Sequence, residues 1–325
     1  MARPPKLTLP LRDGVAASAL ACPPGPWPLV LDFLAERLPL VTRQDWSERM
    51  GRGDVLDDQG QPLPPDTPLA RCQGRRLYYW RWLENEPQVP GEVRILHQDD
   101  HLLVADKPHF LPVTPKGRYV QQTLLTRLRR MTGLADLSPL HRLDRETAGL
   151  VLLSVQPQHR DAYQRLFRDR CVEKVYEAVA PDSDGLPVPL KFPLQLATRL
   201  QEHPVDFMQM QTVDGEPNAF TQVERLASLP GGWARYELRP STGAKHQLRA
   251  QMAHLGLPLK GDRIYPVLLP VEDTPDFSDP LQLLAREIAF TDPVTGAPRQ
   301  FRTQLRLEAA LDVHPSHRPD RRLDP

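Results

Sequence analysis

The chain has 325 residues, of which 41 are Lys or Arg and 41 are Asp or Glu, so its formal net charge is zero. A hydrophobic content of 40% with 25% charged residues excludes a membrane protein and a disordered tail, and the length suffices for a large domain with a smaller one attached. Zero net charge argues against a nucleic-acid binder on average, although a balanced total can hide a basic face.

The three cysteines, Cys22, Cys72 and Cys171, are widely spaced and form no CxxC pair. They indicate neither a disulfide framework nor a zinc site, and they favour a reducing cytoplasm. The run Leu20-Ala21-Cys22 resembles a lipoprotein cleavage site, but four prolines follow it and prevent a helix of membrane length. We therefore expect no membrane association.

The first region divides into a flexible arm, residues 1–24, and a small module, residues 25–86. The module shows an apolar helix pattern from Leu29 to Leu38 and a second helix that Thr42 caps and Gly51 ends. A short strand and turn follow at 53–60, and a further strand is predicted at 71–82. Two short helices before a small β element resemble the ribosomal-protein-type RNA-binding domain that carries the αL motif. A small structural cap is the alternative.

A boundary at 87–91 opens a second domain, predicted at 91–312, with a C-terminal tail at 313–325. Its strand and helix signals alternate, and Gly133 and Gly256 end two of the helices. The predicted strands are 93–97, 102–105, 149–154, 172–180, 219–227 and 233–239. The predicted helices are 122–131, 161–170 and 244–255. This mixture predicts an α+β domain with a mainly antiparallel mixed sheet and flanking helices.

Asp144 is the most informative single residue. It lies in the polar run His141-Arg142-Leu143-Asp144-Arg145-Glu146-Thr147, directly before an apolar strand, and so on a loop at the edge of a rigid sheet. Arg142 and Arg145 flank its carboxylate and favour the ionised form. Such a carboxylate serves as a nucleophile, as a base, or as half of a salt bridge.

The segment from His141 to Gly149 resembles the HRLDxxTSG motif of the RluA family of pseudouridine synthases, with Ala148 in place of the serine. Four further segments are similar to family motifs and occur in the family's order along the chain. They are 99–108 (DDHLLVADKP), 173–178 (EKVYEA), 243–249 (GAKHQLR) with its continuations at 252–258 and 261–265, and 290–296 (FTDPVTG). One family arginine is missing, because GRT has become Gly243-Ala244-Lys245. Leu284-Ala285 and Asp292-Pro293 also depart from the pattern.

The resemblance implies an enzyme that isomerises uridine to pseudouridine in structured RNA, either ribosomal or transfer RNA, without a cofactor or metal. It makes Asp144 the catalytic residue, acting on a flipped-out uridine as nucleophile or base. It also implies that Arg142 displaces the target base, that Tyr176 stacks on it, and that Arg249 pairs with Asp144. Helical spacing predicts that Lys245 and Arg249 share one helix face.

The histidines and the charge distribution give two further expectations. His141, His246 and His254 match no standard metal spacing, so structural roles are expected. Residues 115–170 hold eleven basic and five acidic residues, whereas residues 266–290 hold one basic and five acidic residues. The basic excess predicts that RNA phosphates run past Arg127, Arg129, Arg130 and Arg145.

Two other functions fit parts of the sequence. The missing arginine and the degenerate N-terminal module suit a non-catalytic RNA-binding or ribosome-assembly protein that retains the fold. Glycoside hydrolysis by Asp144 and Glu146 is weaker, because residues two apart on an extended segment point to opposite sides. No sequence feature implies a protein partner, and a monomer is expected.

Overall fold

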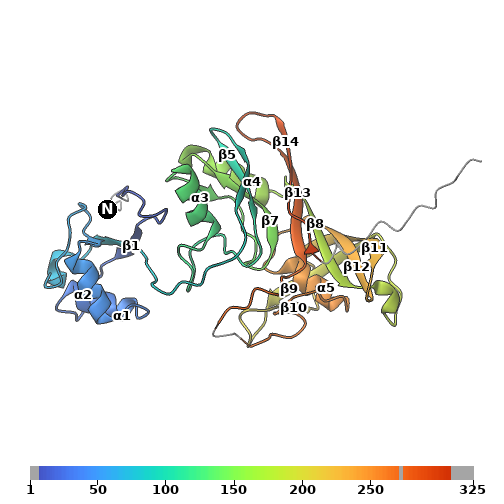
Figure 1. Ribbon diagram of the computed structural model, residues 1–325, viewed down its shortest axis with the longest axis horizontal. Helices are drawn as coiled ribbons and strands as arrows, with labels where there is room; N and C mark the ends of the chain where they lie inside the picture. The colour runs from blue at the N-terminus through green and yellow to red at the C-terminus, as the bar shows by residue number, and fades with distance from the viewer. Residues whose placement is uncertain (1–6, 271–273, 309–325) are drawn as a thin grey trace, which may run out of the picture. The chain divides into compact units, whose positions relative to one another are not determined.

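The structure is a computed structural model that describes residues 7–270 and 274–308. The chain divides into two compact units, Met1–Glu86 with Thr114–Ala135, and Pro87–Val113 with Asp136–Pro325 (Figure 1). The division after Glu86 lies close to the predicted boundary, but residues 114–135, expected in the second domain, group with the first unit. Residues 1–6 of the expected arm and the expected tail at 313–325 lie outside the described residues.

Residues 7–86 of the first unit contain two α-helices and a three-stranded sheet. The helices are α1 (Val30–Arg37) and α2 (Arg43–Gly51), and the sheet has the order β1 (Ser18–Ala21), β3 (Arg76–Tyr79), β2 (Val55–Leu56), with a 3-10 turn η1 (Leu69–Arg71). Thr42 caps α2 as predicted, in a reciprocal capping box with Asp45.

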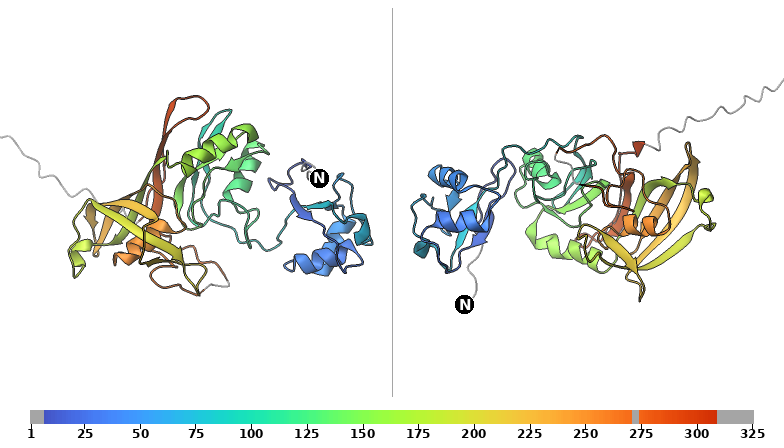
Figure 2. Two further views of the ribbon diagram at one scale, coloured as in Figure 1. Left: turned by 180° about the vertical axis from the view of Figure 1, so that it is seen from behind. Right: turned by 90° about the horizontal axis from the view of Figure 1, so that it is seen from below.

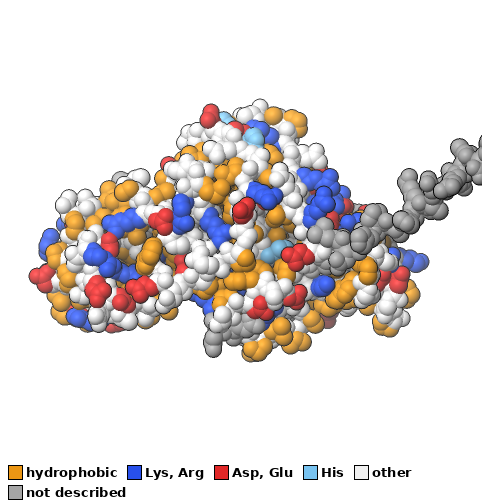
Figure 3. Space-filling model, in the orientation of Figure 1, with side chains coloured by type: hydrophobic (Ala, Val, Ile, Leu, Met, Phe, Trp, Pro, Cys, Tyr) orange, Lys and Arg blue, Asp and Glu red, His pale blue; other side chains and the backbone are white. Residues whose placement is uncertain are grey.

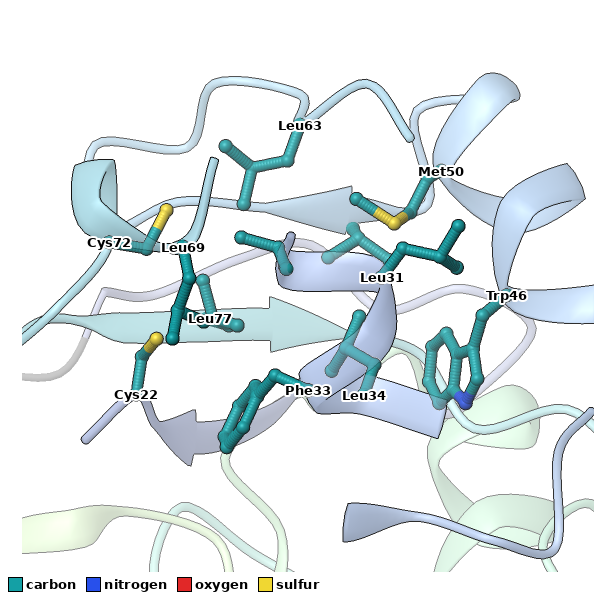
Figure 4. Packing of buried hydrophobic residues seen from close by; sticks show 12 residues of the cluster. Cys22, Leu31, Phe33, Leu34, Trp46, Met50, Leu63, Leu69, Cys72 and Leu77 are labelled. Atoms are coloured by element: carbon teal, nitrogen blue, oxygen red, sulfur yellow. The ribbon is translucent and has the colours of Figure 1, made fainter. Parts of the chain in front are cut away.

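The core of this unit lies between the helices and the sheet (Figure 4). Phe33 and Leu34 of α1 pack with Trp46 and Met50 of α2, and Cys22 is buried among them. The structure therefore differs from the arm expected at 1–24. Residues 18–21 pair with β3 as a strand, because alternate side chains of this short segment can face the sheet's apolar core.

The segment 114–135 is attached to the first unit by polar contacts and close packing. The Glu86 carboxylate accepts hydrogen bonds from the backbone N–H groups of Val120, Gln121 and Gln122 at 2.6–2.8 Å. The segment carries α3 (Leu124–Thr132), which begins after the capping residue Thr123 and ends at Gly133 in the left-handed conformation. A helix close to the predicted 122–131 therefore exists, but it packs within the other unit.

An eleven-stranded sheet forms the second unit (Figure 2). Along its main path the order is β10 (Met210–Val213), β9 (Leu194–Glu202), β11 (Ala219–Leu229), β12 (Trp233–Pro240), β8 (Glu173–Pro181), β13 (Leu283–Thr291), β7 (Ala148–Ser154), β5 (Leu102–Lys107) and β4 (Arg94–Gln98). Two short strands lie off this path: β14 (Pro298–Arg302) pairs with β13, and β6 (Ser138–Pro139) pairs with β7. Among these described pairings only β13 with β7 is parallel, which agrees with the predicted mainly antiparallel sheet.

Each half of the sheet has its own helix. Helix α4 (Arg160–Arg168) packs Tyr163 against apolar side chains of β5 and β7, and helix α5 (Gln247–His254) packs Leu248 and Met252 against β8 and β12. Short 3-10 turns lie at η2 (Pro157–His159) and η3 (Ser183–Gly185). Within the described residues, no helix is both long and apolar enough to cross a membrane.

Candidate active site

The loop 141–147 is fixed at both of its ends. At its start, His141 Nε2 accepts the Leu152 N–H at 3.1 Å, and the ring stacks on Phe167 at 4.8 Å between centroids. Burial lowers the pKa of His141 to about 3, so the ring is neutral and has the structural role expected from the sequence. At its end, the loop enters β7, all of whose residues are buried. The chain thus presents Asp144 from the rim of a rigid strand.

A guanidinium joins Asp144 to two other carboxylates. Arg249 Nη1 lies 3.2 Å from Asp144 Oδ2 and 3.8 Å from Glu146 Oε2, while its Nε and Nη2 bind both oxygens of Asp262 at 2.8 and 2.6 Å. The Arg249 side chain is 1% exposed and that of Asp262 is 0% exposed, whereas Asp144 is 28% exposed. Among these residues, Asp144 therefore offers the most accessible carboxylate, held by a buried network.

Arg249 and the carboxylates around it stabilise one another's charged forms. Burial by itself lowers the pKa of Arg249, but the hydrogen bonds and charge of Asp262, with Asp144 and Glu146, raise it overall. Burial likewise raises the pKa of Glu146, but Arg145 and Arg249 lower it overall, so the carboxylate is ionised. The pairing of Arg249 with Asp144, which the family resemblance implied, is present in the structure.

The loop conformation corrects one expectation. The Thr147 N–H donates to the Asp144 carbonyl at 3.2 Å, so residues 144–147 turn instead of extending. Asp144 and Glu146 consequently approach the same nitrogen of Arg249, and do not point to opposite sides.

A buried lysine supports the loop from within the sheet. Lys107, at the end of β5, is 0% exposed, and its Nζ donates to the carbonyls of Pro108 and Arg145 at 3.0 Å each. Burial lowers the pKa of Lys107 to about 7, against the opposing effect of Glu146 and Asp144. His109 adds a hydrogen bond between its Nδ1 and the Glu146 carbonyl at 2.7 Å.

Tyr176 belongs to β8, between β12 and β13, and packs partly against the cluster that includes Leu248 of α5. Burial raises its pKa, and the negative charge of Asp144 raises it further, so the phenol is neutral. Ala285 of β13 pairs with Tyr176 on one side and with Gly149 on the other, so Tyr176 lies two strands from the start of β7, where the loop that carries Asp144 ends.

Lys245 does not share a helix face with Arg249. His246 adopts a left-handed conformation, with φ 52°, and interrupts the helical path, so α5 starts at Gln247 and not at the predicted residue 244. The Lys245 ammonium instead donates to the Phe207 carbonyl at 2.8 Å and lies 3.5 Å from Glu202, on the connection between β9 and β10. The prediction that Lys245 and Arg249 share a helix face was wrong for this reason.

The predicted RNA-contacting arginines fall into two groups. Arg145 is exposed on the loop 141–147, as is Arg142, and it pairs with Glu146 at 2.7 Å. Arg127, Arg129 and Arg130 lie on α3 in the first unit, where Arg130 pairs with Asp13 at 2.9 Å. On the face in Figure 3, Lys and Arg side chains gather over β8 and β13. Positive charges are therefore spread unevenly over this face, although the net charge of the chain is zero.

Sequence reasoning gave no role to Tyr265, Asp262 or Lys107, and only a structural role to His246. His246 Nε2 lies 3.7 Å from Asp144 Oδ1, and its Nδ1 lies 3.3 Å from the Tyr265 hydroxyl. All four occur in the segments that resemble family motifs. A buried arginine requires a carboxylate partner, which is the signal that could have led to Asp262 once the burial of Arg249 was known. Among residues 7–270 and 274–308, no group of three or more His, Cys, Asp and Glu is placed to hold a metal ion.

Comparisons with known proteins agree with this geometry. The family model described as RNA pseudouridylate synthase matches residues 101–254. The chain is 37% identical over 238 residues to an RNA pseudouridine synthase of Synechocystis sp., a match that covers 73% of this chain and 79% of that protein. It is 30% identical to the dual-specificity RNA pseudouridine synthase RluA of Haemophilus influenzae, with coverage of 67% and 96%.

A solved structure supports the fold. The human RNA pseudouridylate synthase domain containing 1 superposes with a TM-score of 0.53 at 21% identity, covering 66% of this chain and 86% of that one. With the two relatives and the geometry around Asp144, the assignment follows: this chain belongs to the RluA type of RNA pseudouridine synthases.

Proposed function

We propose that the protein isomerises specific uridines to pseudouridine in structured ribosomal or transfer RNA, with Asp144 as its catalytic residue and without a cofactor. The main support for this proposal is that the accessible Asp144 carboxylate pairs with the buried Arg249. The same guanidinium also binds the buried Asp262. A carboxylate in this setting is preorganised, so little reorganisation is needed when charge develops on the target nucleotide.

The reaction breaks the bond between N1 of uracil and C1′ of ribose and rejoins the base through C5. It moves no electrons to an external acceptor and transfers no group from a donor. Asp144 can serve in two ways: its carboxylate attacks the target nucleotide, or it removes a proton from the sugar. Arg249 orients the carboxylate in both roles.

A uridine inside folded RNA must leave its stack to reach Asp144. Arg142, exposed on the same loop, is placed to take the position of the displaced base, and Tyr176 offers an aromatic face for stacking. These two roles follow from the family resemblance and from the location of both residues at the Asp144 site.

The dual-specificity relative favours recognition of more than one RNA. We propose that the first unit, whose paired helices and small sheet fit the αL type, adds RNA contacts of its own. The arginines of α3 would contribute to this electrostatic attraction. We further propose that the protein acts as a monomer in the cytoplasm, where its three free cysteines stay reduced.

Mapping pseudouridines in total RNA tests the function and names the target. A strain without the gene should lack pseudouridine at one or a few positions, and the wild-type gene should restore them. Asp144→Ala should restore none. Equal restoration of growth by the wild-type and Asp144→Ala chains, with an unchanged pseudouridine map, would instead support the non-catalytic RNA-binding protein.

A further inference from the structure

The two oxygens of the Asp144 carboxylate face different partners. Oδ2 accepts a hydrogen bond from Arg249 Nη1 at 3.2 Å, and Oδ1 lies 3.7 Å from His246 Nε2. The His246 side chain is 11% exposed, so it is largely shielded from water, whereas Asp144 remains accessible. His246 is therefore the nearest neighbour on the side of the carboxylate that Arg249 leaves open.

Tyr265 determines which nitrogen of His246 carries the proton. Its hydroxyl oxygen accepts the Met210 N–H at 2.6 Å and lies 3.3 Å from His246 Nδ1. Since the hydroxyl oxygen already accepts the Met210 N–H, this arrangement favours donation of the hydroxyl proton to Nδ1. The ring proton of neutral His246 then resides on Nε2, which faces Asp144. Burial raises the pKa of Tyr265 to about 12, so the phenol keeps the proton that this arrangement needs.

The backbone at His246 gives a second, independent indication. Its φ of 52° and ψ of 21° are left-handed, a conformation that costs about 1 kcal/mol for a residue with a side chain and least for Gly, Asn or Asp. Backbone strain of this kind persists mainly at functional sites. The turn into α5 would accept Asn or Gly more readily, so it does not by itself explain an imidazole here.

On the basis of the function proposed above, we propose that His246 is a positioning residue for Asp144, presenting Nε2–H to Oδ1 while Arg249 holds Oδ2. The two contacts together fix the plane of the carboxylate. In the free protein His246 Nε2 and Asp144 Oδ1 are 3.7 Å apart, which is too far for a hydrogen bond. This distance shortens when the nucleotide binds, as catalytic hydrogen bonds commonly do.

The neutral form of His246 is the one that this role needs. Burial lowers its pKa, Arg249 and Lys245 on its own segment lower it further, and Asp144 and Glu146 on the facing loop raise it, with a net decrease. Protonation at low pH would place a second N–H against the Tyr265 hydroxyl and turn the Asp144 contact into an ion pair. The ion pair withdraws negative charge from Oδ1, and the added proton on Nδ1 removes the acceptor for the Tyr265 hydroxyl.

Two substitutions separate the side-chain role from the backbone role. Asn suits the left-handed backbone but its amide reaches only the position of Nδ1, whereas the amide nitrogen of Gln reaches that of Nε2. We expect His246→Asn to lower kcat by about 100-fold with little change in KM, and His246→Gln to retain activity within about 10-fold of wild type. The acid limb of the kcat profile should move to lower pH in His246→Gln, which has no imidazole to protonate. Equal or higher activity of His246→Asn than of His246→Gln would overturn the proposal.

A spectroscopic measurement keeps the proposal testable if either variant folds poorly. Nitrogen-15 NMR of the wild-type protein, with His246→Gln identifying the signal, should show the Nε2–H tautomer, and Tyr265→Phe should shift His246 toward a mixture. A wild-type Nδ1–H tautomer would overturn the proposal whatever the activities. An inactive wild-type protein would instead contradict the proposed function, while the tautomer result would still stand.

Discussion

Arg249 is the residue on which the site depends, because one buried guanidinium contacts three carboxylates. Asp262 uses both of its oxygens to hold this guanidinium, and its Oδ1 also accepts the Ile264 and Tyr265 N–H groups at 2.8 and 3.1 Å. Asp262 thereby links Arg249 to the segment that positions Tyr265. The Asp262 carboxylate thus holds the Arg249 side chain in its position beside Asp144.

We predict that Asp262→Asn destabilises the protein by about 3–5 kcal/mol, because it removes a fully buried charge from its buried partner. It should also lower kcat by at least about 100-fold, since a shift of Arg249 misorients Asp144. Urea unfolding and single-turnover pseudouridine formation measure the two effects. Glu202→Gln is the control, because it alters a carboxylate that is 73% exposed in its pair with Lys245. Similar losses in the two variants would contradict this view of Asp262.

Lys107 makes stability depend on pH. Its pKa in the folded protein is about 7, below the ordinary value of 10.5, so between these values the unfolded chain binds more protons than the folded protein. Stability due to this residue should therefore rise with pH above 7, by at most about 1.4 kcal/mol per pH unit. Urea unfolding at pH 6.5 and 9 should show wild type gaining stability relative to Lys107→Met. Lys191→Met, at an exposed lysine, controls for loss of a lysine. A constant difference between wild type and Lys107→Met would contradict the prediction.

At the scale of elements, the parallel pairing of β7 with β13 sets the position of the catalytic loop. Gly149 pairs with Ala285, its φ is 111°, and a Cβ atom there would lie 2.3 Å from the Ala285 carbonyl oxygen. No side chain fits between these two backbones. The glycine that ends the HRLD-type motif is thus required by the close approach of two buried strands.

Gly149→Ala should therefore be destabilised by more than about 3 kcal/mol, from the unfavourable backbone conformation together with the displacement of β13. Gly296→Ala is a matched control, because its φ of 73° is also positive but nothing lies within 4 Å of the added methyl group. Its cost should be about 1 kcal/mol. Thermal unfolding of both variants measures the difference, and equal costs would show that the contact with Ala285 is unimportant.

Strong local patterns made most of the elements predictable. The capping residues Thr42 and Gly133 lie at the ends of α2 and α3, and the apolar run at 149–154 lies within β7. Strands β9 and β10 were missed. β9 does alternate between more and less exposed positions, so its pattern was overlooked, whereas β10 has only four residues and its burial does not alternate. The start of α5 was placed three residues early, since only the tertiary contacts of His246 impose its left-handed backbone.

The candidate site was predictable in part. The Asp144 motif and its resemblance to a family pointed to Arg249, which the structure pairs with Asp144, and to Tyr176, which lies two strands from the end of the same loop. The partners Asp262 and His246 could not be read from spacing, because their contacts form only when separate segments of the chain fold together. The turn at 144–147 is a local hydrogen bond that the assumption of an extended segment overlooked. The predicted helix face of Lys245 was wrong because His246 interrupts the helical path.

At the scale of the molecule, zero net charge conceals an uneven distribution. The basic excess of residues 115–170 is shared between the two units, with three arginines on α3 and others on the catalytic loop and α4. The acidic stretch at 266–290 includes Glu272 and Asp273, which lie outside the described residues. A chain of this kind can bind RNA electrostatically without an overall positive charge.

We predict that a triple variant of α3, with Arg127, Arg129 and Arg130 changed to Gln, binds RNA more weakly. The slope of log K against log salt should fall in magnitude by up to about 3, because fewer phosphates are neutralised. Filter binding between 50 and 200 mM salt, a range of about fourfold, measures this slope. Gln at Arg199, Arg235 and Arg239 removes the same charge from β9 and β12 and should change it less. An unchanged slope in the α3 variant would contradict the charge argument and leave the family assignment intact.

The most direct test of the whole account concerns Asp144 itself. Asp144→Asn keeps the shape of the side chain, and Arg249 keeps its two hydrogen bonds to Asp262. The purified variant and wild type are incubated with RNA from a strain that lacks the gene, and pseudouridine is measured at the mapped positions. We predict wild-type unfolding temperature and RNA affinity for Asp144→Asn, with pseudouridine formation reduced by at least about 10,000-fold. Pseudouridine formation by Asp144→Asn at a rate near wild type would contradict the account.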